Sequence, residues 1–225
     1  MPASPEAVAK RMTVAISAKH AKVRAGQHEA GTAFSIRRID AGKLVLPTGR
    51  ICVTDAYSAD EYPPLNRLVP PGDYPVHIVV AQLPEDLPFG NERGAFIVVS
   101  FSDARVSSWE PVTAVAPAEP CFTDKRPNAF VQQGATGVFS PEAGAVHFAH
   151  MRQQFDQQLE AIRKKANRFG MNDWINYRPG QDPANVIICE AGFGDGSFEC
   201  FIGLTPAGRV ARLVLDYDIA EPAKA

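Results

Sequence analysis

The chain has 225 residues, of which 45% are hydrophobic and 21% charged, and its 23 Lys and Arg residues are matched by 25 Asp and Glu residues. A chain of this length and composition can bury a core without metals or disulfides. A formal charge of -2 gives no overall field that would attract nucleic acid or anionic lipid, and no stretch approaches the roughly 20 apolar residues of a membrane-spanning helix. We therefore expect no nucleic-acid partner and no membrane partner. Because the N-terminus lacks the apolar run of a signal peptide, we expect a cytoplasmic protein.

The first 40 residues are locally basic, with seven Lys and Arg residues against three acidic ones. A weak apolar stripe at helical spacing predicts a modest helix over residues 5–25. We divide the chain into an N-terminal helical arm at residues 1–31, a single β-rich α+β domain at residues 32–220 and a tail at residues 221–225. The basic side chains of the arm would lie on a solvated face or contact an acidic partner.

From residue 32 onward, short runs rich in β-branched and aromatic residues alternate with Pro and Gly, which predicts strands. A turn at 47–50 joins two of them, since Pro47 presets one backbone angle and Gly49 accepts a positive φ. Residues 75–82 and 94–101 are almost continuously apolar, which is typical of central strands covered on both faces. Before the first of these two strands, four prolines make residues 55–74 a long irregular loop.

Residues 141–170 contain the clearest helical pattern in the chain. Apolar residues recur three and four positions apart and predict a stripe that lies on a sheet: Phe148, Met151, Phe155, Leu159, Ile162, Ala166 and Phe169. Gly170 stands where a C-cap glycine is expected. The opposite face is polar and mainly basic. We therefore expect one long covering helix.

The C-terminal residues predict a three-stranded antiparallel meander. The Asp-Gly pair at 195 and 196 is a strong signal for a two-residue hairpin turn. In that register Cys189 and Cys200 share the core face as diagonal neighbours, too far apart for a disulfide, while Glu190 and Glu199 face outward. The expected fold is α+β, mainly an antiparallel sheet or a two-layer sandwich with one covering helix.

Motifs of catalysis, phosphate binding and metal binding are absent from the sequence. The four cysteines match no zinc or redox spacing, so we expect reduced, mostly buried thiols. His147 and His150 lie three residues apart and could share a metal, but we favour partly exposed helix histidines. We expect no metal and no cofactor.

The end of the chain is acidic, because residues 181–225 carry seven acidic and three basic residues. The candidate partner-binding side chains lie at or near the outward face of the predicted meander: Glu190, Asp195, Glu199 and Asp216. Such an array is either a solvated face or a docking surface for a basic partner. Two carboxylates at a suitable separation can also act as an acid and a base.

Three segments together resemble a bacterial family of proteins of unknown function, DUF4241. They are LVLPTGRICVTDAY at residues 44–57, VPPGDYPVHIVV at residues 69–80 and AGFGDGSFECFIGLTPAGRVARLVLDYDI at residues 191–219. The resemblance covers residues 34–219 and leaves the N-terminal arm outside. It implies a small cytosolic bacterial protein without an assigned activity. Compact mixed domains of this kind often serve as immunity proteins for secreted toxins, an analogy that concerns fold and not function.

The acidic C-terminal segment and the absence of catalytic signatures favour a non-enzymatic protein-binding module. In its most specific form this is an immunity-type inhibitor that docks its acidic face on a basic partner, such as a bacterial toxin.

Two alternatives remain open. The first is a small-molecule hydrolase, in which Asp195, Glu190, His77 or His147 would converge at a pocket beside residues 55–74. The second is a homodimer, in which the basic segment at residues 5–25 of one copy docks against the acidic meander of the other.

Overall fold

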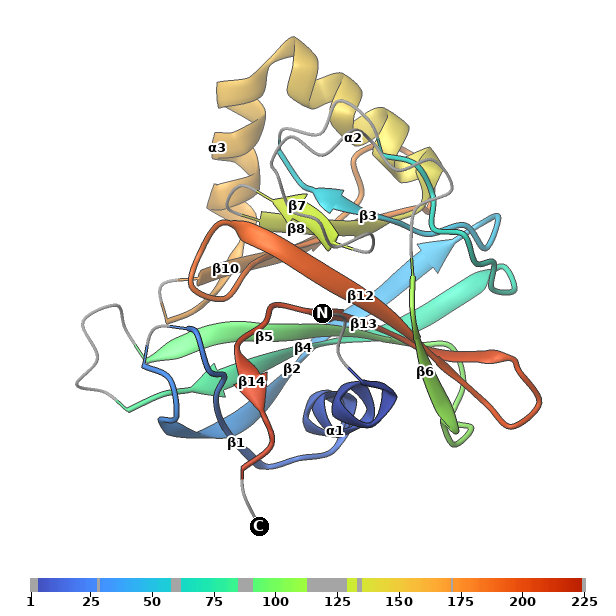
Figure 1. Cartoon of the computed structure of the whole chain (residues 1–225). Coiled ribbons are helices and arrows are strands. Elements are labelled where there is room, and N and C mark those ends of the chain that lie inside the picture. Colours follow the sequence, from blue (N-terminus) through green and yellow to red (C-terminus); the bar gives the residue numbers. More distant parts are fainter. Residues whose placement is uncertain are drawn as a thin grey trace.

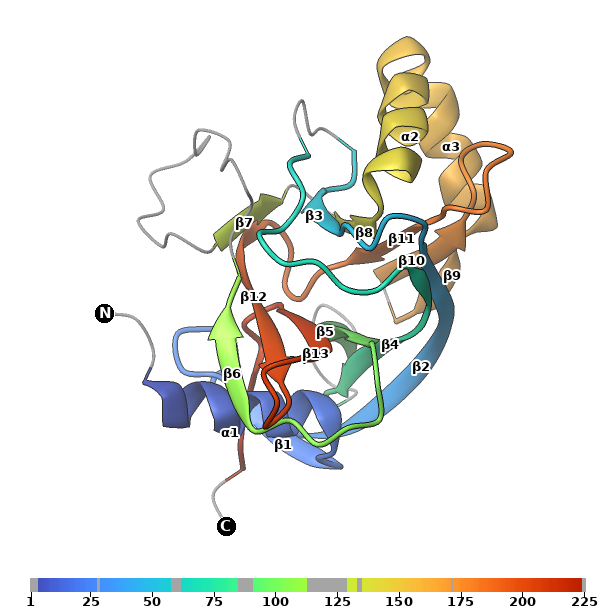
Figure 2. The same ribbon diagram turned by 90° about the vertical axis from the view of Figure 1, so that its right-hand side faces the viewer.

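A computed structural model describes residues 4–27, 29–57, 62–84, 91–112, 129–132, 135–170 and 172–223. In this part of the chain two antiparallel sheets lie face to face, and helices cover the outer face of each (Figure 1). The layers follow the order α1 (Pro5–Ile16), sheet A, sheet B, and then the pair α2 (Pro141–Gln153) and α3 (Phe155–Lys165). Figure 2 shows the same stacking from the side. The expectation of an α+β fold built mainly from antiparallel strands is confirmed.

Sheet A contains nine of the described strands, in the order β14-β1-β2-β4-β5-β13-β12-β6, with β7 also paired to β12. Their bounds are β1 (His20–Val23), β2 (Ala33–Leu46), β4 (Gly72–Gln82), β5 (Glu92–Ser100), β6 (Ser108–Pro111), β7 (Ala129–Gln132), β12 (Gly196–Leu204), β13 (Val210–Asp216) and β14 (Ala220–Glu221). The two strands expected to be central, β4 and β5, pair in antiparallel fashion in the middle of this sheet.

Sheet B contains five of the described strands, in the order β3-β8-β11-β10-β9. Their bounds are β3 (Cys52–Asp55), β8 (Ala135–Phe139), β9 (Asn167–Phe169), β10 (Asn172–Tyr177) and β11 (Val186–Glu190). One face of this sheet packs on sheet A. The other face packs on α2 and α3, around Phe139, Phe148 and Ile162.

Alternation along the strands explains the layers. In β4, Ile78 and Val80 point into the core between the two sheets, while Val79 and Ala81 point to the opposite side, where α1 lies. All four side chains are fully buried. The expectation that this strand is covered on both faces is therefore confirmed.

Helix α1 is capped at both of its ends, and its apolar face packs on sheet A. Ser4 caps its N-terminus by accepting a hydrogen bond from the backbone N–H of Ala7 at 3.2 Å, and Met12 and Ala15 are buried on the sheet. The last turn of the helix contains no basic residue. Instead, the guanidinium of Arg38 in β2 donates to the carbonyls of Val14, Ala15 and Ala18, which would otherwise lack partners.

The N-terminal helix is shorter than the sequence pattern predicts. It ends at Ile16, and residues 20–23, which the pattern includes in the helix, form β1. This strand pairs with β2 on one side and with β14 on the other. Tertiary pairing at the sheet edge thus overrides a weak helical period.

The hairpin predicted at 195 and 196 does not form, because β11 belongs to sheet B and β12 to sheet A. Residues 191–195 carry the chain from one sheet to the other. Cys189 and Cys200 nevertheless share one core, since the inner faces of the two sheets are opposed, and both are free thiols. The turn at 47–50 also connects the two sheets, with Gly49 at the expected positive φ of 71°.

The long helix predicted over residues 141–170 is divided into two. Gln154, with φ of -147° and ψ of 59°, ends α2 and precedes α3. Gly170 adopts a positive φ of 56°, but it lies after β9 and not at a helix C-terminus. The two helices meet at the tip of the molecule that lies opposite α1 (Figure 1).

Candidate functional site

The structure divides the four candidate partner-binding residues among different places. Glu190 shares the side of β11 that faces the α2–α3 pair, whereas Glu199 and Asp216 lie on the side of sheet A that faces α1. Asp195 is exposed on the segment that crosses between the sheets. Because β11 and β12 lie in different sheets, these carboxylates form no single face.

Arg11 of α1 occupies the centre of the acidic residues on sheet A. Its guanidinium lies 2.9 Å from the Asp216 carboxylate and 3.5 Å from that of Glu199, with Asp218 at 3.6 Å. The Asp216 side chain is only 1% exposed, so the expected outward orientation is wrong, because α1 covers this side of the sheet. Arg24 also pairs with Asp218. Basic N-terminal and acidic C-terminal residues therefore pair within one chain.

Within the described residues, no hydrogen bond or ion pair joins any two of the four groups named for hydrolysis. His147 is buried in α2, where its Nε2–H donates to the carbonyl of Ala56 at 2.6 Å and its Nδ1 accepts from the hydroxyl of Tyr177. His77 lies in sheet A, opposite Asp40 and Val98. With both ring nitrogens of His147 occupied, this residue is a buried structural histidine and not the partly exposed one that we expected.

Metal and thiol chemistry find no support in the described residues. Within the described ranges, no three His, Cys, Asp or Glu side chains are grouped so that they could hold a metal ion. Burial raises the pKa of the Cys52 thiol to about 12, and it also raises the pKa values of Cys189 and Cys200. These three thiols are therefore protonated near neutral pH and unsuited to act as nucleophiles.

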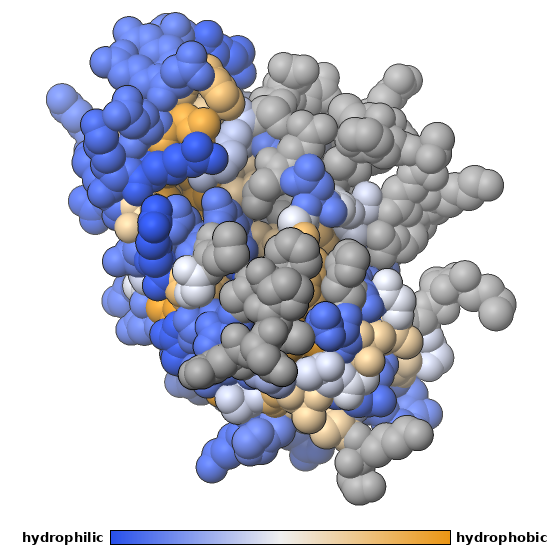
Figure 3. Space-filling model, turned by 90° about the vertical axis from the view of Figure 1, so that its left-hand side faces the viewer, coloured by the Kyte–Doolittle hydropathy of each residue, from blue (hydrophilic) through white to orange (hydrophobic). Residues whose placement is uncertain are grey.

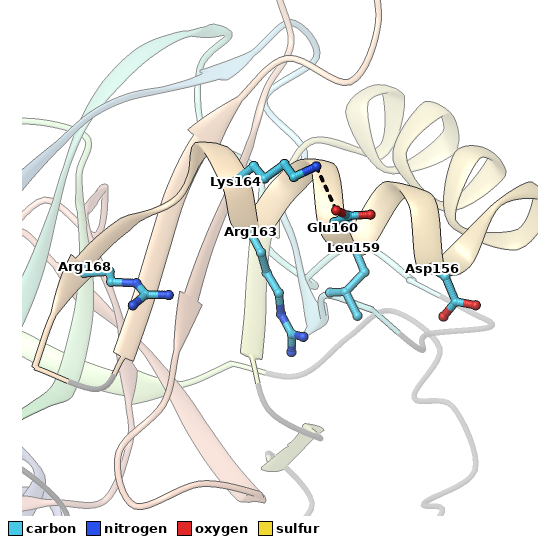
Figure 4. Close-up of a pocket in the computed structure, with 6 residues that line it drawn as sticks. All are labelled: Asp156, Leu159, Glu160, Arg163, Lys164 and Arg168. Atoms are coloured by element: carbon cyan, nitrogen blue, oxygen red, sulfur yellow. Dashed lines mark ion pairs between the residues drawn. The ribbon is translucent and has the colours of Figure 1, made fainter.

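A shallow groove of about 480 Å³ runs along α3, and we call it the α3 groove. Its lining residues come from α3 and β9: Asp156, Leu159, Glu160, Arg163, Lys164 and Arg168. Figure 4 shows that Leu159 and Arg163 point to one side of the helix and that Arg168 extends toward them from β9. Lys164 and Glu160 pair at 2.7 Å on the other side.

The end of the α3 groove at Arg163 and Arg168 adjoins a set of polar groups at the end of sheet B. Glu190 is half-buried and accepts a hydrogen bond from the backbone N–H of Asp173 at 2.9 Å. Burial raises the pKa of Glu190, and Arg163 and Arg168 are near enough to oppose that rise. Burial also raises the pKa of Tyr57 to about 12, again opposed by Arg163. Arg168 pairs with Asp173 at 3.2 Å.

Helix α3 is the most exposed of the described helices. Ile162 is its only buried residue, and Phe155 at its first position is 45% exposed. The sequence pattern places Phe155 and Leu159 in a core stripe, so it misses this surface. A compositional signal was nevertheless present, because residues 152–168 contain five basic residues and two acidic ones. Figure 3 shows this side, with an apolar patch enclosed by hydrophilic side chains in the upper part.

These features define a layered α/β/β/α protein with a groove along its outermost helix. The family model described as "Protein of unknown function (DUF4241)" matches residues 44–215, and the chain belongs to this family. The match covers sheet B, the α2–α3 pair and the other strands of sheet A, but it leaves α1, β1, β14 and most of β2 outside. Comparisons with curated proteins and with solved structures give no match. Among the helices of the described ranges, none is long and apolar enough to cross a membrane.

The buried ion pairs of Arg11 lead to a first prediction. Replacing Arg11 with Met should lower the free energy of unfolding by about 3–5 kcal/mol, because Asp216 would keep a buried charge without its partner. Urea denaturation measures this change. Lys10→Met, at the neighbouring exposed position, should have little effect. In the Arg11→Met background, Asp216→Asn should cost less than in the wild type. Equal losses for Arg11→Met and Lys10→Met would contradict the role of Arg11.

The second prediction concerns pH. Burial lowers the pKa of His147 below its usual 6.5. Below about pH 6.5 the unfolded chain therefore binds a proton that the folded chain does not bind. The free energy of unfolding consequently decreases as the pH is lowered. As the pH falls from about 6.5 toward the lowered pKa of folded His147, wild type should lose about 1.4 kcal/mol for each pH unit.

His147→Gln should abolish this part of the pH dependence in urea denaturation, and His150→Gln on the same helix should retain most of it. Comparing the two variants removes the contributions of other titrating groups. Identical pH profiles for both variants would show that His147 is not the responsible residue.

Proposed function

We propose that this protein is a non-enzymatic protein-binding module that docks through the α2–α3 pair, in its most specific form as an immunity-type inhibitor of a bacterial toxin. The observation that carries the proposal is the exposed side chain of Phe155, at the tip of the helix pair and next to the α3 groove.

An aromatic side chain at such a place is suited to anchor a partner. Aromatic residues and arginines dominate the binding energy of protein interfaces, mainly at the centre of a patch from which the bound partner excludes water. Phe155 and the half-buried Leu159 supply apolar area, and Arg163 lies one turn beyond Leu159. A rim of charged residues around apolar contacts is the usual arrangement of such interfaces.

The acidic residues that first suggested docking support a different role. Asp216 and Glu199 pair with Arg11, and Glu190 accepts a backbone hydrogen bond on the other side of the molecule. Because these groups are divided and partly neutralised, we place the docking surface at α3. The proposed partner is therefore acidic where it contacts α3, whereas the sequence alone suggested a basic partner.

The hydrolase alternative has no comparable observation. It requires two or more of its groups to lie within hydrogen-bond reach around a pocket. His147 is occupied by Ala56 and Tyr177, while His77 and Asp195 lie elsewhere in the fold. We therefore do not pursue it.

The docking surface can be tested by site-specific photo-crosslinking. A photoreactive phenylalanine analogue at position 155 should capture one protein at close to stoichiometric yield when the tagged protein is illuminated in its native lysate, because residue 155 would lie inside the interface. Mass spectrometry identifies the captured protein. For the immunity form of the proposal, this protein should be a toxin whose activity the purified protein blocks.

The matched control carries the same analogue at Leu68, which is 65% exposed and lies on a different segment. It should capture nothing beyond background. Equal capture from both positions, or none from position 155, would refute docking through the α2–α3 pair.

A further inference from the structure

We infer that the α3 groove binds an acidic segment of the protein partner, with Arg163 and Arg168 contacting its carboxylates and Leu159 and Phe155 contacting an adjacent apolar side chain. This inference rests on the proposed docking function, because it specifies the chemistry of the partner at the same surface.

Charge is the first argument. The chain has a net charge of -2, yet the segment from residue 152 to residue 168 has three more basic than acidic residues. The lining of the α3 groove itself has three basic side chains against two acidic ones, so its charge is also opposite in sign to that of the molecule. Arg163 and Arg168 at one end of the groove favour an acidic partner segment that approaches in one orientation.

Internal structure accounts for only part of this charge. Basic residues in the last turn of a helix interact favourably with its dipole, which applies to Arg163, Lys164 and Lys165. Arg168 lies beyond the helix, in β9, and its side chain is 80% exposed although it pairs with Asp173. Arg163 is exposed and forms no ion pair with any described residue. Two guanidinium groups thus face the groove with free donors.

The geometry suits carboxylates. Arg163 and Arg168 belong to different elements, and their side chains approach the same end of the groove (Figure 4). A planar guanidinium can bind a carboxylate through two parallel hydrogen bonds, which are shorter and stronger than neutral ones. Two such groups would hold two neighbouring acidic side chains of an extended or helical segment.

The other lining residues favour a protein over a nucleic acid. Asp156 and Glu160 line the same groove and would repel a continuous phosphate backbone. Leu159 in the groove and Phe155 beside it supply an apolar contact of the kind that a protein segment can fill. A discontinuous set of acidic and apolar side chains therefore matches this surface better than a uniform polyanion.

The test uses a short fluorescent peptide of repeated Glu-Glu-Leu as the probe and fluorescence anisotropy as the readout. The full-length protein should bind it at least about tenfold more tightly than the same peptide with Gln in place of Glu, since charge-assisted hydrogen bonds are lost in the second peptide. Binding should weaken as salt is added. Arg163→Gln together with Arg168→Gln should lower the affinity for the Glu peptide about tenfold or more.

The control pair is Arg50→Gln with Arg209→Gln, which makes the same change in net charge at exposed positions on other segments. It should change the affinity less than about twofold, because only long-range charge is altered. Arg163→Lys adds a variant that keeps the charge and should bind with intermediate affinity. Thermal unfolding of each variant checks that it is folded.

Several results would overturn the inference. These are no preference of the wild type for the Glu peptide, equal losses in the two double variants, or tighter binding of an oligothymidine of similar length. The inference and the proposed function can fail separately. If crosslinking at position 155 captures a protein that the Arg163 and Arg168 variant binds as well as wild type does, only the inference fails. If the arginines bind the Glu peptide but no protein is captured, the docking function fails.

Discussion

The fold depends on one constraint, which is that the central strands of sheet A are apolar on both faces. Val79 and Val80 are neighbours in β4 and point to opposite sides, and both are fully buried. Burial of each such side chain contributes about 1.5–3 kcal/mol, so neither face can be left open to water. Sheet B covers one face and α1 covers the other. The α2–α3 pair meets a separate requirement, because it covers the apolar outer face of sheet B.

The cover provided by α1 creates an electrostatic condition. Asp216 follows Leu215 on a strand whose two faces are both covered, so its carboxylate is removed from water. An isolated buried charge would be strongly destabilising, and Arg11 from the covering helix neutralises it. The guanidinium of Arg38 donates hydrogen bonds to the carbonyls at the end of α1. The basic beginning and the acidic end of the chain are therefore complementary parts of one molecule.

The sequence predicts local properties better than it predicts partners. Continuous apolar runs correctly identify β4 and β5 as central strands, because burial on both faces leaves a compositional trace. The Asp-Gly pair at 195 and 196 signals a turn, but the hydrogen-bonded turn lies at residues 191–194 and Gly196 already begins β12. A turn signal also does not determine whether the next strand joins the same sheet. The face assignment of Cys189 and Cys200 survives this error, since opposed sheets share one core. The prediction of one acidic face is wrong, because Glu190 and Glu199 lie on the outer sides of two different sheets, which are far apart in the layer order.

The sequence pattern does not predict the candidate site, because it does not predict the break between α2 and α3 at Gln154. Neither Gly nor Pro stands there, so an unbroken helical period is the natural interpretation of the sequence. In an unbroken helix Phe155 and Leu159 would continue the stripe of Phe148 and Met151 and pack on sheet B. The break turns α3 onto a new course, with Ile162 as its one buried residue and Phe155 at the tip. The folded position of α3 leaves an aromatic side chain and two arginines beside a groove, and this exposed arrangement is what supports the proposal that α3 is a docking surface.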